Sequence, residues 1–229
     1  MTDEKDRTLE HIAVLHDLPQ HARRALEKQC RWREFPAHEQ IVDRLSDTGD
    51  VYFVVRGKVR VVNYSYSGRE ISYADIPAGG FFGEIAAIDG APRSANVVAL
   101  AETLVATLAP ELFIRLLADE PKFALTVMKG LTRIVRGSTD RIMELSTLGA
   151  ANRIHAELLR LGRPYVRADN TAVIRPAPLH VDIAGRAGTT RESVTRALSE
   201  LARQGIIRRQ SDALVVLDIE RLEELVEIV

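Results

Sequence analysis

The chain has 229 residues, of which 46% are hydrophobic and 28% charged, so it is long enough to bury a core and to divide into two domains. Its formal net charge is -1, which excludes a general basic field, and any surface for nucleic acid must therefore be local. Cys30 is the only cysteine. The sequence thus excludes an intrachain disulfide, and also an iron–sulfur cluster or zinc finger held by the cysteines of one chain.

The beginning of the sequence is charged, with Asp3, Glu4 and Lys5 and no apolar segment behind them. No run approaches the roughly 18 apolar residues that a membrane-spanning helix needs. We expect a soluble, cytoplasmic protein with no membrane partner.

The first half of the chain changes from a helical to a strand pattern. Residues 8–30 are predicted to be helical, with a break at Leu18-Pro19. From Trp32 onward, short β-branched or aromatic runs are separated by glycine-containing turns. The predicted strands are 40–42, 51–55, 59–62, 71–74, 95–99 and 103–108. Many short strands with turn glycines predict an antiparallel sandwich or barrel over residues 32–109.

One loop inside this segment carries groups that suit a cyclic phosphate. Gly80-Phe81-Phe82-Gly83-Glu84-Ile85 is followed, nine positions after Glu84, by Arg93-Ser94-Ala95-Asn96. Glycine lets backbone N–H groups approach a phosphate, Arg93 offers a forked pair of donors, and Glu84 is an acceptor for a ribose 2′-hydroxyl. The simpler interpretation is a surface turn with an incidental Glu-Arg ion pair. We expect a solvent-filled site in the absence of ligand, so that loss of Arg93 leaves the fold intact.

A long helix is predicted to begin at Pro121, because proline suits a first helical turn. Residues at spacings of three and four form a coiled-coil stripe along it, which predicts a parallel homodimer. The stripe consists of Met128, Leu131, Val135, Ser138, Ile142 and Leu145. Ser138 interrupts the apolar pattern beside Gly137, a residue that costs a helix interior about 1 kcal/mol relative to alanine. Either Ser138 fixes the helix register, or Ser138 and Thr139, one from each subunit, face the purine of a bound nucleotide.

A smaller C-terminal domain is predicted to begin near residue 150. Residues 182–188 form a short predicted helix that ends in glycine, and Thr189-Thr190 start a second helix that runs to Gln204. Two helices across a glycine turn indicate a helix-turn-helix, and strands at 206–209 and 213–217 make a wing. Such domains also dock proteins, so this geometry alone leaves the function open.

Side chains of the second helix favour DNA. Arg191, Glu192 and Arg196 lie near its N-terminal end, where arginine pairs with guanine and glutamate accepts from cytosine in the major groove. From Ile183 to Gln210 the chain carries six arginines against two glutamates, a local charge of +4 per subunit. The alternative is an ordinary solvated helix with Glu-Arg pairs.

Together these motifs resemble the CRP/FNR family, the bacterial transcription regulators typified by the cyclic-AMP receptor protein. The glycine loop is similar to the family's phosphate-binding cassette, and residues 32–109 are similar to its jelly-roll. Ser138-Thr139 align with a Thr-Ser pair that holds adenine on the family's dimer helix. Arg191-Glu192-x-x-x-Arg196 looks like the family's base-reading set. At Leu179-His180-Val181 the chain departs from the family, where a Ser or Thr cap is frequent, so His180 is a weaker phosphate contact.

The resemblance implies an α+β fold with an N-terminal cyclic-nucleotide-binding jelly-roll and its helices at 1–119, a dimerisation helix at 120–149 and a winged helix-turn-helix at 150–229. The ligand-binding residues it implies are Phe82, Gly83, Glu84, Ile85, Arg93, Ser94, Ala95, Ser138 and Thr139. The DNA-binding residues are His180, Thr189, Thr190, Arg191, Glu192, Thr195, Arg196, Arg208 and Arg209.

The resemblance further implies a homodimer that is switched by a cyclic nucleotide and binds a TGTGA-type inverted repeat in double-stranded DNA, with RNA polymerase as another partner. Cyclic AMP is the first candidate effector. Cyclic GMP is the second, because hydroxyl groups match guanine as well as adenine. A different class is a regulatory subunit whose helical domain docks a protein partner.

Metal and enzyme chemistry are not expected. The histidines offer no metal pair: His11, His16, His21, His38, His155 and His180. No constellation of nucleophile and base stands out in the chain. We therefore expect no enzyme, no metal, no haem and no iron–sulfur cluster.

Overall fold

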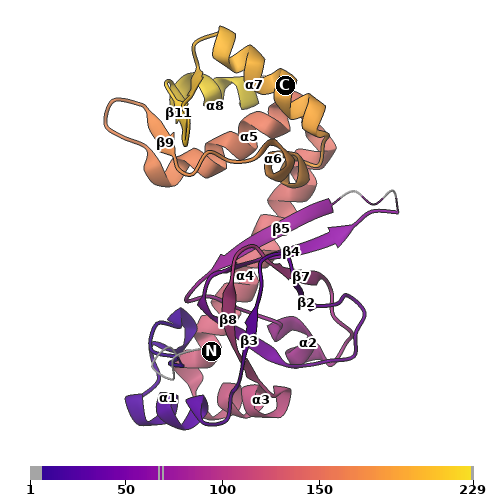
Figure 1. Cartoon of the computed structure of the whole chain (residues 1–229), viewed down its shortest axis with the longest axis vertical. Coiled ribbons are helices and arrows are strands. Elements are labelled where there is room, and N and C mark those ends of the chain that lie inside the picture. Colours follow the sequence, from indigo (N-terminus) through magenta and orange to yellow (C-terminus); the bar gives the residue numbers. More distant parts are fainter. Residues whose placement is uncertain (1–6, 67, 69, 228–229) are drawn as a thin grey trace. The chain divides into compact units, whose positions relative to one another are not determined.

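The computed structural model describes residues 7–66, 68 and 70–227. The chain divides into two compact units, one formed by residues 1–65 with 72–134 and the other by residues 66–71 with 135–229. Helix α4 (Pro121–Thr147) begins in the first unit and ends in the second (Figure 1).

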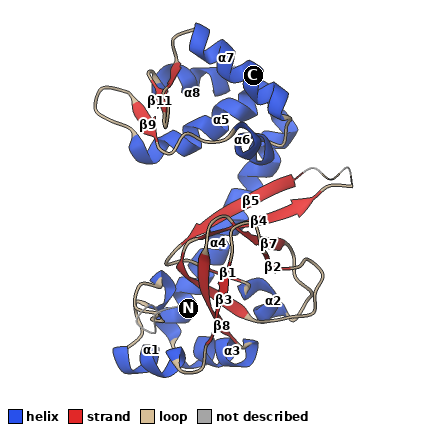
Figure 2. Cartoon of the chain, in the orientation of Figure 1, coloured by secondary structure: helices blue, strands red, loops and turns tan. Residues whose placement is uncertain are grey.

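The described part of the first unit contains two four-stranded sheets (Figure 2). One has the strand order β1-β8-β3-β6 and the other β2-β7-β4-β5. The strands are β1 (Arg31–Phe35), β2 (Gln40–Val42), β3 (Val51–Arg56), β4 (Lys58–Tyr64), β5 (Glu70–Pro77), β6 (Phe81–Phe82), β7 (Asn96–Ala99) and β8 (Thr103–Leu108). All six predicted strands are present and pair in an antiparallel manner where the register is defined, whereas β1 and β6 were not predicted.

Side chains of both sheets meet in a shared core. Val54 of β3 and Phe82 of β6 come from the first sheet. They pack with three valines of the second sheet, Val42, Val59 and Val97. β-branched side chains suit such half-buried strand faces, so the sequence pattern and the packing agree on a sandwich.

The prediction of an α-helix from residue 8 is wrong as far as Leu18. This stretch forms turns and a short 3₁₀ helix, η2 (Ala13–Leu15), before α1 (Gln20–Glu27) begins. Four of its five buried residues, Leu9, Ile12, Leu15 and Leu18, recur every three positions, and Val14 is the fifth. That spacing suits the 3₁₀ repeat better than the 3.6-residue repeat of an α-helix.

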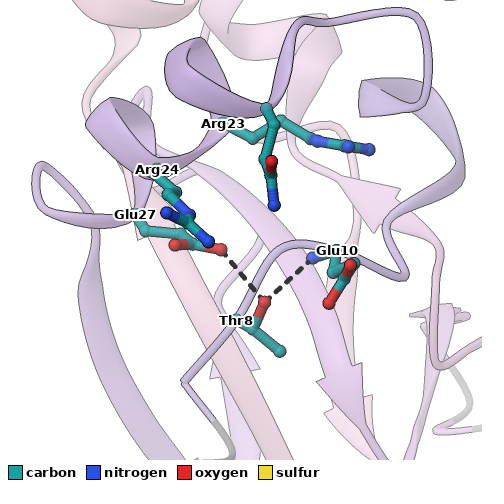
Figure 3. Close-up of a pocket in the computed structure, with 6 residues that line it drawn as sticks. Thr8, Glu10, Arg23, Arg24 and Glu27 are labelled. Carbon is teal, nitrogen blue, oxygen red and sulfur yellow. Dashed lines mark hydrogen bonds between the residues drawn. The ribbon is translucent and has the colours of Figure 1, made fainter.

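Polar contacts connect this N-terminal segment to α1 (Figure 3). Thr8 Oγ1 and the backbone N–H of Leu9 both donate to Glu27 Oε1, at 3.0 and 2.8 Å. Thr8, Glu27, Arg23 and Arg24 are among the residues that line a small surface pocket here. Glu27 therefore satisfies two donors at the start of the segment, ahead of the turn whose backbone bond runs from the N–H of Ile12 to the carbonyl of Leu9.

Two further helices of the first unit, α2 (Glu84–Asp89) and α3 (Pro110–Asp119), were not predicted. Helix α4 begins at Pro121, as predicted. Phe113 of α3 and Phe123 of α4 are fully buried, with their rings edge to face at 5.7 Å. Burial of each ring contributes about 1.5–3 kcal/mol, which anchors the start of α4 in the first unit.

The second unit combines helices with a small sheet of order β10-β11-β9. Its elements after α4 are α5 (Ala150–Gly162), η3 (Arg163–Tyr165), β9 (Ala172–Ile174), α6 (His180–Ala187), α7 (Arg191–Arg203), β10 (Ile207–Arg209), β11 (Leu214–Val216) and α8 (Ile219–Glu227). The core includes Ile154, Leu158, Ile183, Val194 and Leu222. The two helices and the wing strands were predicted, whereas α5, α8 and β9 were not.

Local signals explain the turn between α6 and α7. Gly188 has φ 58° and its N–H bonds the carbonyl of Ala184, which ends α6 with the left-handed residue that glycine tolerates best. Thr190 then caps α7, because its hydroxyl accepts the N–H of Ser193 at 3.2 Å. This helix-turn-helix agrees with the predicted winged fold.

Within the described ranges, no helix is both long and apolar enough to cross a membrane. The same residues include no group of three or more histidine, cysteine or acidic side chains placed to hold a metal ion.

Candidate functional site

The glycine loop turns sharply between β6 and α2. Gly83 has φ 92°, a left-handed conformation that favours glycine. A Cβ atom at this position would lie 2.7 Å from the carbonyl oxygen of Asp50 and 2.8 Å from Nη1 of Arg93. Any larger residue would therefore displace the arginine that the loop surrounds.

Arg93 is held inside the protein rather than facing a solvent-filled site. Its side chain is almost wholly buried, with a relative exposure of 3%. The guanidinium donates to Thr48 Oγ1 at 3.1 Å, to the carbonyl of Gly83 at 3.0 Å and to the carbonyl of Asp50 at 2.6 Å. Its central carbon lies 5.6 Å from the ring centre of Tyr52. The expectation of a solvent-filled site is wrong, because a buried guanidinium requires acceptors and the chain supplies its own.

These three contacts do not engage every N–H donor of Arg93. An arginine has five N–H donors, and these three hydrogen bonds engage three of them. Burial lowers the pKa of Arg93, although the nearby Tyr52 and Asp50 oppose that shift. The group is therefore a desolvated cation, for which an anionic ligand would be a strong partner.

Glu84 is the second buried charge of this loop. It is the first residue of α2 and has a relative exposure of 8%. Burial raises the pKa of Glu84, and its own backbone N–H and the charge of Arg93 act in the opposite direction. Arg93 bonds carbonyls and Thr48 but forms no ion pair with Glu84 among the described side chains. An incidental Glu-Arg pair therefore does not explain the two residues.

The remaining loop residues differ in their exposure. Phe82 is buried and stacks on Tyr52, with ring centres 4.9 Å apart. Ile85 and Ser94 are exposed, and Ala95 is half-buried. The predicted ligand-binding residues of this loop thus include one core aromatic, Phe82, together with exposed or half-buried residues.

Ser138 and Thr139 lie on α4 and belong to the second unit, whereas the glycine loop belongs to the first. Both are exposed in the single chain, and Thr139 Oγ1 donates to the carbonyl of Val135 at 3.1 Å. Four apolar residues of the stripe are also exposed by about half or more: Met128, Val135, Ile142 and Leu145. A helix that leaves such a stripe uncovered in one chain has a surface suited to a second helix.

Most of the predicted DNA-binding residues form an exposed basic face. Arg191, Glu192 and Arg196 project from the first turns of α7, and Arg208 and Arg209 are exposed on β10. Thr190 is used as the helix cap, and Thr189 is buried at 8% exposure. Thr189 therefore supports the turn and presents little side chain to a ligand.

His180 joins three parts of this face. Its Nδ1 lies 2.9 Å from Thr195 Oγ1, and its Nε2 lies 3.3 Å from Nη1 of Arg209. Because arginine only donates, Nε2 must be the acceptor and Nδ1 must carry the proton. Thr195 in turn donates to the carbonyl of Arg191 at 3.0 Å. The neutral imidazole thus bridges the start of α6, the recognition helix α7 and the wing, a role that the sequence did not predict.

Acid should weaken this bridge. Partial burial and the charges of Arg209 and Arg191 lower the pKa of His180. An unfolded histidine takes up a proton below about pH 6.5, whereas the folded one resists until a lower pH. The unfolded state then binds more protons, so the stability of the second unit falls as the pH drops below about 6.5.

His180→Gln should reduce this pH dependence, because glutamine keeps a donor and an acceptor but does not titrate. Hydrogen exchange of the α7 amides at pH 7.5 and 5.5 measures the effect. Burial also lowers the pKa of His155, so the variant should keep the part of the pH dependence of stability that His155 contributes. An identical change of stability between the two pH values in wild type and variant would show that His180 does not contribute to the pH dependence.

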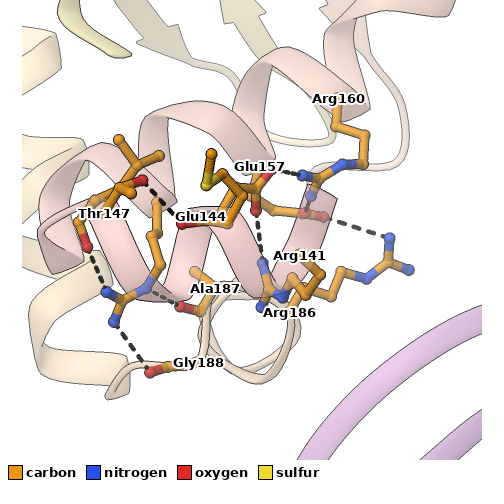
Figure 4. A network of polar contacts seen from close by, with 11 residues as sticks. Arg141, Glu144, Thr147, Glu157, Arg160, Arg186, Ala187 and Gly188 are labelled. Carbon is orange, nitrogen blue, oxygen red and sulfur yellow. Dashed lines mark hydrogen bonds and ion pairs between the residues drawn. The ribbon is translucent and has the colours of Figure 1, made fainter. Parts of the chain in front are cut away.

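An ion-pair network around the buried Glu157 connects the end of α4 to α5 and α6 (Figure 4). Glu157 of α5 is 1% exposed and pairs with Arg160 and, at 3.4 Å, with Arg186 of α6. Arg160 also bonds Glu144 of α4 at 2.5 Å, and Arg141 bonds Glu144 at 3.1 Å. Burial raises the pKa of Glu157, with the arginines opposing it. The sequence analysis missed this network because its members are spread over 46 positions of the chain, from Arg141 to Arg186.

Two more contacts fix the helix-turn-helix to the same helices. Arg153 of α5 donates to the carbonyls of Leu148 and Ala187, at 2.7 and 2.9 Å. A Cβ atom at Gly188 would lie 3.2 Å from Leu145 of α4. The end of α4 therefore lies directly against the turn before the recognition helix.

Two domain families match the chain. Residues 32–120 match the cyclic nucleotide-binding domain, and residues 152–225 match the Crp-like helix-turn-helix domain. The cyclic AMP receptor protein of Thermus thermophilus is 32% identical over 179 residues, covering 76% of this chain and 78% of that protein. A CRP-like cAMP-activated global transcriptional regulator of Mycobacterium tuberculosis is 24% identical over 218 residues, covering 95% of this chain and 97% of that protein.

Solved structures agree with these matches. A CooA mutant from Carboxydothermus hydrogenoformans has a similar fold, with a TM-score of 0.81 at 22% identity over 99% of this chain and 97% of that chain. The Thermus thermophilus catabolite activator protein has a TM-score of 0.54 at 28% identity over 94% of this chain and 98% of that chain. Because both domain families are matched and together span most of the sequence, the chain belongs to the CRP/FNR family of transcription regulators.

Proposed function

We propose that this chain is a homodimeric transcription regulator whose sequence-specific DNA binding is switched by a cyclic nucleotide. The observation that carries the proposal is the pair of buried charges in the glycine loop, Arg93 and Glu84, which do not neutralise each other through a direct ion pair. A ligand with one anionic group and one hydroxyl donor satisfies both.

The nucleotide is proposed to bind through its phosphate to the guanidinium of Arg93 and to the exposed Ser94. Glu84 accepts the ribose 2′-hydroxyl. Gly83, Ile85 and Ala95 frame the ligand, and Phe82 supports the loop from the core. Gly83 is required because the loop backbone approaches Arg93 too closely for a side chain.

Cyclic AMP is the first candidate effector. Relatives such as the Thermus thermophilus and Mycobacterium tuberculosis regulators are named for cyclic AMP. The hydroxyls of Ser138 and Thr139, one from each subunit, supply the purine contacts. Cyclic GMP is the second candidate, since a hydroxyl both donates and accepts and so matches guanine as well.

Dimerisation is proposed to occur through the exposed stripe of α4, with two helices packed in parallel. Ser138 and Thr139 lie on this helix, and so do Arg141, Glu144 and Leu145, which contact the helix-turn-helix and its supporting helices. A ligand that changes the packing of α4 therefore changes the position of α7 through contacts already present in the second unit.

DNA is proposed to be read by Arg191, Glu192 and Arg196 of α7 in the major groove, while Arg208 and Arg209 contact phosphates. A dimer places two such helices on a TGTGA-type inverted repeat with half-sites about 34 Å apart, one turn of DNA. We propose RNA polymerase as a further partner, the cytoplasm as the location and regulation rather than catalysis as the activity, in keeping with relatives named as transcription regulators.

Two measurements on the purified chain test the proposal. Calorimetric titration with cyclic AMP and cyclic GMP determines whether and which nucleotide binds. A gel shift on a TGTGA palindrome and on random DNA, with and without nucleotide, determines whether binding is specific and switched. A protein that binds nucleotide but no DNA would instead support the alternative, a regulatory subunit that docks a protein partner.

Ser138→Ala should weaken nucleotide affinity by roughly 1–3 kcal/mol, because a purine hydrogen bond is left unmade. The dimer should be unchanged or tighter, since the variant removes a hydroxyl from an apolar stripe. Sedimentation and calorimetry on one sample measure both quantities. Ser146→Ala is the control, because the Ser146 hydroxyl already bonds the carbonyl of Ile142 and lies outside the stripe. A weaker dimer with normal nucleotide affinity would make Ser138 a register residue only.

A further inference from the structure

Asn63 of β4 lies beside the proposed phosphate site. Its side chain is buried, with a relative exposure of 7% for the residue. Nδ2 donates to the carbonyl oxygen of Ser94 at 3.2 Å and to the hydroxyl of Tyr73 at 3.2 Å. Ser94 directly follows Arg93, so Asn63 holds the backbone of the loop at the point where a phosphate would be bound.

The orientation of this amide is fixed by its partners. A backbone carbonyl only accepts, so the nitrogen and not the oxygen of Asn63 must face Ser94. Both N–H groups are then used, by Ser94 and Tyr73. Oδ1 points elsewhere, is buried, and accepts no hydrogen bond from any residue that the structure describes.

Asn63 also interrupts an apolar strand face. Side chains two apart on a strand share a face, and Val59 and Val61 pack into the core cluster between the sheets. By this alternation Asn63 points to the same interior, at the end nearest Ser94. On the neighbouring strand β5, the hydroxyl of Ser72 is likewise buried and unpaired among the described residues. Buried acceptors are nearly always paired in folded proteins, so an acceptor left open here indicates a missing donor.

We infer that Asn63 Oδ1 accepts a hydrogen bond from the exocyclic amino group of the bound purine, which makes Asn63 a residue that determines base specificity. This inference rests on the proposed function. A cyclic phosphate carries acceptors only and cannot pair with Oδ1. The ribose 2′-hydroxyl is assigned to Glu84. The donors that remain on a cyclic purine nucleotide are the 6-amino group of adenine and, in guanine, the 2-amino group and the ring N1–H.

Calorimetry with matched pairs of nucleotides tests the inference. Cyclic AMP is compared with the cyclic phosphate of purine riboside, which lacks the 6-amino group, and cyclic GMP with cyclic IMP, which lacks the 2-amino group. Cyclic IMP keeps N1–H, so the comparison of cyclic GMP with cyclic IMP separates the amino group from the ring donor. The wild type should prefer the amino-bearing member of one pair by about tenfold, and Asn63→Ala should lose that preference. The pair that shows the effect identifies which amino group is bound.

Tyr73→Phe is the matched control, because it removes a partner of Nδ2 and leaves Oδ1 in place. It should keep the preference of the wild type. Where Asn63→Ala is poorly folded by Trp32 fluorescence, Asn63→Leu fills the space and allows the same comparison. If Asn63→Ala loses affinity equally for all four nucleotides and keeps the preference for the amino-bearing member, Asn63 only supports Ser94. That result would overturn the inference. Nucleotide binding without any preference in the wild type would overturn it too, whereas no binding of any nucleotide would overturn the proposed function itself.

Discussion

Arg93→Leu is expected to abolish nucleotide binding and also to destabilise the first unit. The variant removes the buried cation of the loop, and charge-assisted hydrogen bonds to a phosphate contribute about 1.5–3 kcal/mol each. With two such bonds lost, affinity should fall by about 100-fold or more, which is roughly 2.7 kcal/mol. Calorimetry with cyclic AMP and cyclic GMP measures this loss.

The loss of stability follows from the three acceptors that Arg93 satisfies. The carbonyls of Gly83 and Asp50 and the hydroxyl of Thr48 would each lose a donor. Thr48 is exposed and also contacts Ser46, and the carbonyl of Gly83 also accepts the N–H of Ala87, so the main cost falls on the carbonyl of Asp50. A buried polar group without a partner costs about 1–3 kcal/mol, and the free energy of unfolding should fall by about that amount. Trp32 is the only tryptophan and belongs to the first unit, so its fluorescence during urea unfolding reports this change.

Thr48→Val is the matched control for this variant. It removes one acceptor of Arg93 and leaves the guanidinium and both carbonyl contacts in place. Stability should fall by no more than about 1 kcal/mol, with nucleotide still bound. If Arg93→Leu binds nucleotide with wild-type affinity, Arg93 does not bind the phosphate. If its stability is unchanged, the three contacts of Arg93 do not support the fold.

Elements with a local signal were predictable from the sequence. Short β-branched or aromatic runs between glycine-containing turns mark most strands of both sheets, because such side chains suit strand positions. Pro121 marks the start of α4, and Thr190 marks the cap of α7. Helix α3 was missed because its N-cap residue, Ala109, has no side chain that could cap a helix.

Contacts between distant positions were not predictable. The residues around Arg93 show this, since Thr48 and Asp50 precede it by 45 and 43 positions. Sequence chemistry predicted Arg93 to be a phosphate ligand, but only the fold shows that it supports its own loop. The bridge from His180 to Thr195 and Arg209 is a second example, because it depends on how α6, α7 and β10 pack.

Arg191→Ala and Arg209→Ala are expected to have opposite effects on specificity. Arg191 is exposed at the first position of α7, where a recognition helix meets base edges. Loss of a bidentate guanine contact should cost about 1–3 kcal/mol on a TGTGA palindrome and much less on random DNA. Arg209 lies on the wing, so its loss should weaken both DNAs alike and reduce the salt slope by about one unit.

Arg209→Ala has a second consequence, because Arg209 is the donor that His180 Nε2 accepts. Its loss frees His180 but leaves the bond between His180 and Thr195, so α7 should keep its position on α6. Arg203→Ala is the control for charge alone: Arg203 lies at the other end of α7 and pairs with Glu200. We expect it to change affinity for either duplex by less than about 0.5 kcal/mol.

Fluorescence titrations on specific and random duplexes at several salt concentrations separate these effects. Specific binding that falls tenfold or more in Arg191→Ala, with random DNA nearly unaffected, would support base reading by α7. If Arg191→Ala instead loses affinity equally on both duplexes, its guanidinium contacts phosphates only. The local charge of the second unit would then account for DNA binding without sequence recognition by this arginine, and the base-reading role would have to move to Glu192 and Arg196.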